Sequence, residues 1–198
     1  MTKKTKILIT VILAVIVGGG IFVYQYRWMP KREIKIQSLQ KIKECERIED
    51  DFKKYDCFQK LAISTKDASI CGLIESDYMS FECFKEIGIS TKDLSLCKKI
   101  NREYKSLRAN CITGIAKNLK NITICEEIDF INGWPENCYS SVGAMVKDPS
   151  ICKETKEIHY RDHCLTGVAV GLKDSSLCER IQIDSIRDYC LERVETVD

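Results

Sequence analysis

Apolar and polar positions repeat along this chain in a unit of 26 to 28 residues, which is copied six times from about residue 41 to the C-terminus. In each copy a second cysteine follows the first by 12 to 14 positions, and apolar residues stand one and four positions beyond it. From that second cysteine to the first of the next copy, the separation is always 14. Apolar positions three and four residues apart form one face of a helix. The pattern therefore predicts an all-α fold, an α-solenoid of six short helical hairpins in which each copy contacts its neighbours.

The first helix of each hairpin is predicted from its capping residue. Five copies carry Asp or Asn four residues before the first cysteine, and these side chains accept hydrogen bonds from the free N–H groups at a helix start. In the fifth copy Pro149 follows the cap and fits the first helical position. We expect a first helix of about ten residues, shorter than an isolated helix needs to be stable in water, and in the second copy a turn centred near Asp77. The capping residues are Asp67, Asp93, Asn121, Asp148 and Asp174.

The second helix carries a small residue where a neighbouring helix is expected to approach. This residue stands five positions after the second cysteine, and in the sixth copy Glu195 replaces it. A charge there predicts the solvent-facing end of the stack. The first copy also departs, because Lys41 takes the cap position, so we expect a longer helix from about Pro30 to lead into it. The small residues are Ala62, Gly88, Ala116, Gly143 and Ala169.

All twelve cysteines belong to this pattern, and none has the Cys-x-x-Cys spacing typical of metal and redox sites. Such a set indicates disulfides, which persist in oxidising compartments. Cys71 and Cys83 lie about equally far from the predicted turn, which favours pairing within each copy; the alternative is pairing between copies, such as Cys83 with Cys97. A bridge closing a loop of about 12 residues contributes roughly 3 kcal/mol. The favoured pairs are Cys45 with Cys57, Cys71 with Cys83, Cys97 with Cys111, Cys125 with Cys138, Cys152 with Cys164 and Cys178 with Cys190.

The N-terminal region differs from the repeats in composition. Residues 7–26 contain no charge and match the ~20 residues that cross a bilayer as a helix. The lysines before them also fit a cleaved signal peptide, but the segment is long for one and no small-residue cleavage site follows, so we expect an uncleaved anchor. Because disulfides belong outside the cytoplasm, we expect a single-pass cell-membrane protein with its C-terminal domain outside. Its expected parts are a cytoplasmic segment 1–6, a transmembrane helix 7–26, a helical linker 27–40 and a repeat domain 41–198.

The charge of the chain argues against nucleic acid as a partner. There are 31 Lys and Arg against 29 Asp and Glu, and four of the basic residues precede position 28. The repeat part is therefore nearly neutral and slightly acidic, whereas proteins that bind nucleic acid carry a basic surface.

Two phrases of the last copy resemble known repeats. Asp174-Ser-Ser-Leu-Cys-Glu-Arg-Ile181 and Arg187-Asp-Tyr-Cys190 are similar to Cys-paired helical repeats of membrane-anchored, largely uncharacterised archaeal proteins. The likeness extends over about residues 41 to 194, although the Arg-Asp-x-Cys part is clean only in the last two copies. The resemblance implies an archaeal surface protein and brings no activity with it.

The residues that carry catalysis or bind metals are sparse. His159 and His163 lie four apart beside Cys164; with Cys164 in a disulfide they supply two ligands, too few for a zinc site, so we expect surface histidines and no metal or cofactor. No Gly-x-Ser-x-Gly motif is present, and an enzyme is not expected. Asn121-Ile-Thr123 matches the acceptor pattern for glycosylation and also occupies a cap position, so the sequence leaves both roles open.

The segment between the two helices is where the copies differ in length, and it carries aromatic residues. Rigid scaffolds often bind partners through such segments, although aromatic side chains also cover the open ends of hairpins. We expect a non-catalytic protein-interaction module whose partner is another envelope or surface protein. The alternatives are a passive spacer of the cell envelope and a thiol redox protein, which would need exposed, reactive cysteines. The candidate partner-binding residues are Tyr78, Tyr104, Phe130, Trp134 and Tyr160.

Overall fold

The computed structural model describes residues 37–128 and 134–196. Helices joined by short turns make up this part of the chain, which contains no strand, and the all-α prediction is confirmed. It divides into two compact units, one ending at Cys57 and one beginning at Phe58. The elements are α2 (Asp51–Thr65), η1 (Ala68–Leu73), α3 (Asp77–Thr91), α4 (Leu94–Lys99), α5 (Lys105–Leu119), η2 (Ile122–Glu127), α6 (Trp134–Val146), η3 (Pro149–Glu154), α7 (Ile158–Leu172), η4 (Ser175–Arg180) and α8 (Asp184–Glu195).

The first unit holds the first cysteine pair. Residues 37–46 are helical, and the disulfide Cys45–Cys57 joins them to α2 with a Cα–Cα distance of 5.6 Å. Lys41 lies inside this helix. The sequence predicted this, because the first copy has lysine where the other copies have a capping residue. The helix start that we expected near Pro30 lies outside the described residues.

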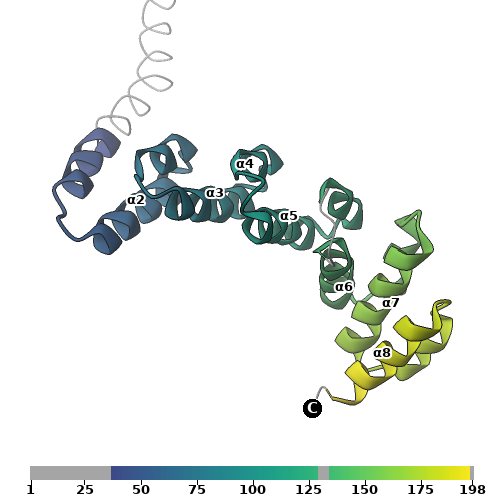
Figure 1. Ribbon diagram of the computed structural model, residues 1–198. Helices are drawn as coiled ribbons and strands as arrows, with labels where there is room; N and C mark the ends of the chain where they lie inside the picture. The colour runs from purple at the N-terminus through teal and green to yellow at the C-terminus, as the bar shows by residue number, and fades with distance from the viewer. Residues whose placement is uncertain (1–36, 129–133, 197–198) are drawn as a thin grey trace, which may run out of the picture. The chain divides into compact units, whose positions relative to one another are not determined.

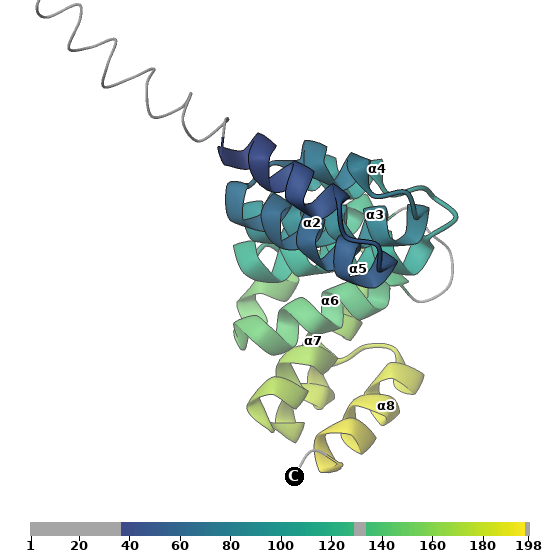
Figure 2. The ribbon, with the colours of Figure 1, turned by 90° about the vertical axis from the view of Figure 1, so that its left-hand side faces the viewer.

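In the second unit the long helices follow one another in chain order from α3 to α8, each in contact with the next (Figures 1 and 2). Every short helix packs against the long helix that follows it. Helices α3 and α5 run parallel, since Tyr104, at the start of α5, contacts Phe81 on α3, and Asn118, at the end of α5, donates a 3.2 Å hydrogen bond to the carbonyl of Ile89 near the end of α3. Helices α6 and α7 run parallel as well, since Gly167 and Gly171 of α7 face Ser140 and Ala144 of α6 in the same order. We call the side where α3, α5, α6 and α7 begin the first-turn edge and the opposite side the last-turn edge.

Each disulfide joins the two cysteines of one copy, so the predicted pairing within copies is confirmed. The Cα–Cα distances are 5.6 or 5.7 Å, within the normal range for a disulfide. Pairing between copies is excluded, because Cys83 bonds to Cys71 and not to Cys97. After Cys45–Cys57, the bridges in chain order join Cys71 to Cys83, Cys97 to Cys111, Cys125 to Cys138, Cys152 to Cys164 and Cys178 to Cys190.

A continuous apolar core extends through the third to sixth copies, from Cys97 to Cys190, and Phe81, Phe84 and Ile89 of the second copy pack against it. The predicted apolar stripe is buried at Ile87, Ile115, Val142 and Val168. Glu195 is exposed, as expected for the last copy. Helices α3, α5, α6 and α7 therefore each bury the predicted position of the stripe.

The predicted caps are confirmed, but the predicted length of the first helix is wrong. Each of the five cap side chains accepts a hydrogen bond of 2.8 to 3.0 Å from the backbone N–H two residues later. The short helices then span six residues, most of them as 3-10 helix. They end early because the residue three places after the first cysteine adopts extended backbone, and Ile100 and Ile181 are buried there.

The turn that we expected near Asp77 is also misplaced. Asp77 is the first residue of α3, so the turn comes before it and Cys83 lies near the middle of the long helix. The long helix therefore begins before Cys83, where the predicted stripe starts, and its first two turns already carry the apolar residues Tyr78, Met79 and Phe81.

None of the helices in the described ranges is long and apolar enough to cross a membrane. The predicted transmembrane segment 7–26 lies outside those ranges.

Candidate interaction edge

The first-turn edge gathers the aromatic residues of the second and third copies. Tyr78 stands in the first turn of α3 and Tyr104 directly before α5. Their ring centres lie 6.1 Å apart, and the rings of Tyr104 and Phe81 meet edge to face with their centres 5.1 Å apart. Tyr104 is half-buried by these contacts, whereas Tyr78 stays 53% exposed. Tyr78 is therefore the member of this cluster that a partner can reach.

A second aromatic pair joins the fourth and fifth copies. Tyr160, on the first turn of α7, stacks on Tyr139 of α6 at 4.8 Å with the rings nearly parallel. Tyr139 is 2% exposed, and burial, with the negative charge of Glu126, raises its pKa to about 12. A hollow of about 370 Å³ opens beside the pair, with Pro135 and Glu126 in its lining. Tyr160 thus packs the fifth copy against the fourth and also lines an open hollow.

The two histidines lie beside the same helix pair. The Nε2 atom of His159 is 3.0 Å from Glu136 Oε1 on α6, and the rings of His159 and His163 are 4.8 Å apart. Burial, followed by the charge of His159, lowers the pKa of His163. Together with Tyr189 these side chains line a hollow of about 360 Å³. In the described ranges no three or more His, Cys, Asp or Glu side chains are grouped as a metal site.

The five candidate residues thus have different positions. Tyr78, Tyr104 and Tyr160 lie on the first-turn edge, but Tyr78 and Tyr160 belong to the first turns of helices and not to loops as expected. Phe130 falls outside the described residues. Trp134 begins α6, and the structure does not describe its side chain. Ile158 also lies on this edge: it begins α7 and is 47% exposed. It is aliphatic, so the aromatic pattern that pointed to the other candidates did not include it.

The junction of α6 with α7 contains a glycine contact that the sequence analysis recognised only in part. Gly143 was predicted as a small residue, and a Cβ there would collide with the carbonyl of Cys164. Gly167 and Gly171, four residues apart on α7, face the backbone of Ser140 and Ala144 in the same way. The two helices therefore pack backbone to backbone, and the sequence signal was the four-residue spacing of Gly167 and Gly171.

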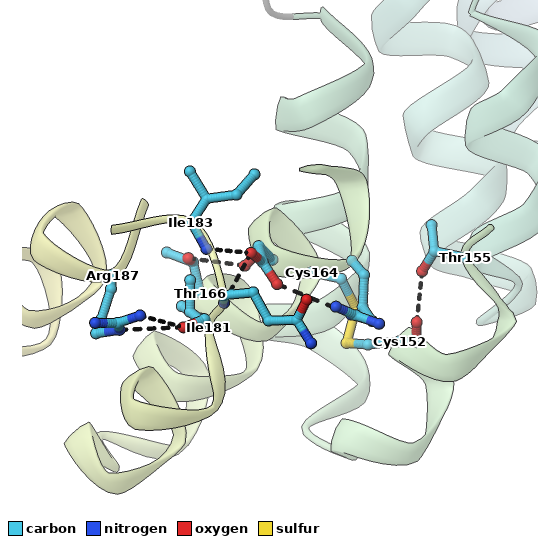
Figure 3. Close-up of polar contacts among 10 residues, drawn as sticks. Cys152, Thr155, Cys164, Thr166, Ile181, Ile183 and Arg187 are labelled. Atoms are coloured by element: carbon cyan, nitrogen blue, oxygen red, sulfur yellow. Dashed lines mark hydrogen bonds and ion pairs between the residues drawn. A yellow bond between two sulfur atoms is a disulfide. The ribbon is translucent and has the colours of Figure 1, made fainter. Parts of the chain in front are cut away.

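A buried carboxylate joins the fifth copy to the sixth. Asp162 on α7 is fully buried, and its Oδ2 accepts hydrogen bonds from the backbone N–H groups of Gln182 and Ile183. Arg187 of α8 donates through Nε and Nη2 to the carbonyl of Ile181 (Figure 3). Each copy of the Arg-Asp-x-Cys phrase thus makes a structural contact, through Asp162 to the next copy in the fifth and through Arg187 to its own turn in the sixth.

All twelve cysteines are in disulfides, and every one except Cys57 is buried. Figure 3 shows the bridge between Cys152 and Cys164, both of which are buried. Reactive cysteines are exposed and carry a lowered pKa, so this arrangement gives the thiol redox hypothesis no support.

Comparisons of the chain with protein families, with curated proteins and with solved structures found no match. Function must therefore be inferred from the geometry of the edge itself.

Proposed function

We propose that this protein is a membrane-anchored, extracytoplasmic, non-catalytic protein-interaction module. Six disulfides in one chain favour an oxidising compartment, and the uncharged segment 7–26 has the length of a single transmembrane helix. The repeats stack as an α-solenoid outside the membrane, where the partner is another envelope or surface protein.

The observation that carries this proposal is the combination of exposed apolar side chains with open hollows on the first-turn edge of a cross-linked scaffold, since Leu119 and Leu172, exposed on the last-turn edge, line neither hollow. Tyr78 is 53% and Ile158 47% exposed, and open hollows adjoin the edge between α6 and α7. Aromatic anchors carry much of the binding energy at protein interfaces. A scaffold that disulfides hold rigid loses little conformational entropy on binding.

A photo-crosslinking amino acid placed at single positions in the full chain, in intact membranes, tests the proposal. Ile158 and Leu172 form a matched pair, since they begin and end α7 and are 47% and 44% exposed. Crosslinks from Tyr78 and Ile158 to the same partner, with none from Leu172 or Leu119, are the expected result. Adducts of equal yield from both edges would contradict the assignment of the first-turn edge.

A passive spacer of the cell envelope is the second candidate, and the ring contacts favour it. Tyr104 packs on Phe81 and Tyr160 on Tyr139, so these aromatic residues join neighbouring copies. In a spacer, Tyr160→Ala lowers the melting temperature and none of the four crosslinking positions gives an adduct. In an interaction module, the adducts from Tyr78 and Ile158 form.

A further inference from the structure

Asn121 differs from the other caps in a way that capping does not require. The other four caps are aspartates followed two residues later by serine, at Ser69, Ser95, Ser150 and Ser176, whereas Asn121 is followed by Thr123. Asn and Asp cap helices about equally well, so an amide adds nothing to this role. The combination of Asn with Thr two residues later, and Ile122 between them, is the acceptor pattern for asparagine-linked glycans.

The geometry of this turn leaves the amide nitrogen available. Asn121 Oδ1 accepts hydrogen bonds from the backbone N–H and from the hydroxyl of Thr123, at 3.0 and 2.8 Å. Both residues are exposed. The cap therefore engages only the oxygen of the side chain, and Nδ2 makes no hydrogen bond to the residues that the structure describes. The turn is made within three residues, so it needs no long-range packing to form.

We propose that Asn121 is glycosylated, by transfer of a glycan from a lipid-linked sugar phosphate donor. Nδ2 forms a bond to C1 of the first sugar, the bond from C1 to the phosphate oxygen breaks with its electron pair leaving on that oxygen, and Nδ2 loses one proton to a base of the transferase. The transfer requires no oxidant or reductant. The proposal that Asn121 is glycosylated rests on the proposed extracytoplasmic location of the repeats, since the donor and the transferase act there.

The position of Asn121 fits the proposed function. It follows Lys120, which ends α5, and so stands on the last-turn edge. Tyr78 and Ile158 begin their helices on the opposite edge. A glycan at Asn121 therefore leaves the first-turn edge open to a protein partner and covers a side committed to turns between copies.

The test expresses the full chain in a cell that exports it and glycosylates a reference protein at asparagine. Mass spectrometry of the peptide containing Asn121 is expected to show a glycan, which Asn121→Asp and Thr123→Ala both remove. Asn121→Asp restores the cap of the other copies, so its melting temperature should equal that of the deglycosylated protein. An unmodified Asn121 beside a glycosylated reference protein would overturn the proposal.

Two further variants separate the acceptor pattern from mere exposure. Asp93→Asn creates an acceptor with Leu94 and Ser95, whereas Asp148→Asn creates one with Pro149 in the position where the pattern excludes proline. A glycan is expected at position 93 and none at position 148. Modification at position 148 without modification at position 93 would overturn the proposed basis of recognition.

Digestion by a membrane-impermeant protease distinguishes a failure of the site from a failure of the location. An unmodified chain that the protease digests on intact cells overturns glycosylation alone. An unmodified chain that is protected overturns the extracytoplasmic location as well.

Discussion

Asp162 on α7 accepts a 2.9 Å hydrogen bond from the backbone N–H of Ile183, the residue that caps α8. The side chain of Ile183 makes no cap hydrogen bond, and Asp162 of the preceding copy holds the backbone at Gln182 and Ile183, directly before α8 begins. Arg161 is the closest positive charge, with its Nε 3.9 Å from Asp162 Oδ1. One buried carboxylate thus joins the last two copies.

Asp162→Ala is expected to lower the free energy of unfolding by about 2 kcal/mol or more, because charge-assisted hydrogen bonds are worth ~1.5–3 kcal/mol and two backbone donors lose their partner. Denaturant unfolding of the oxidised protein measures the change. Asp188 occupies the same place in the sixth copy and is exposed, so Asp188→Ala is the matched control, with an effect within about 0.5 kcal/mol. Equal losses for both variants would contradict the role of Asp162.

The glycine contact between α6 and α7 gives a second prediction. Gly167→Ala places a Cβ against the carbonyl of Ser140, and the helices must separate to admit it. Overpacking of this kind costs about 1–3 kcal/mol. A Cβ at Gly72 would meet no neighbouring atom within 4 Å, so Gly72→Ala is expected to be neutral or to stabilise by up to ~1 kcal/mol through the lower entropy of the unfolded chain. Thermal unfolding of the two variants distinguishes a tight contact from a general effect of replacing glycine.

Local features were predicted well and contacts between copies poorly. Each cap bonds a residue two positions on, and each disulfide joins two cysteines of the same copy. Both features lie within one copy, so the repeated sequence pattern was enough to predict them. The role of Asp162 could not be predicted, because its partners are backbone groups of the next copy and no side-chain pattern records them. The start of α3 at Asp77 was missed because Ser76 and Asp77 are residue types as typical of a turn as of a helix start. Of the candidate residues, Tyr78 is exposed and Tyr160 packs on Tyr139 of the preceding copy, and the irregular spacing of these aromatic residues does not reveal such contacts.

Five lysines end helices in a backbone conformation that favours glycine. Lys66, Lys92, Lys120, Lys147 and Lys173 have φ between 52 and 60°. A side chain in this left-handed region costs roughly 1–2 kcal/mol, so Lys120→Gly is expected to raise the free energy of unfolding by up to ~1 kcal/mol. Lys117→Gly, inside α5, is the control and should lower it by about 1 kcal/mol. A stabilising effect of both changes would show that lysine charge, and not backbone conformation, is responsible.

His163 predicts how stability depends on pH. Burial and the charge of His159 lower its pKa, against the opposing charges of Glu136 and Asp162, and Tyr189 lines the same hollow. Because the folded pKa lies below the ordinary value of about 6.5, the unfolded chain binds the proton more readily than the folded one. This contribution to stability is therefore complete above about pH 6.5 and is lost as the pH falls towards the folded pKa.

Denaturant unfolding of His163→Gln between pH 7.5 and pH 5 measures that contribution directly. The variant removes the titrating group from the half-buried position, so its stability should fall less steeply with decreasing pH than that of the parent protein. His159→Gln is the companion variant, because it removes the neighbouring positive charge while leaving His163 buried. If the parent protein and His163→Gln lose stability along the same curve, the proton is taken up elsewhere and burial of His163 does not control the acid sensitivity of the α6–α7 junction.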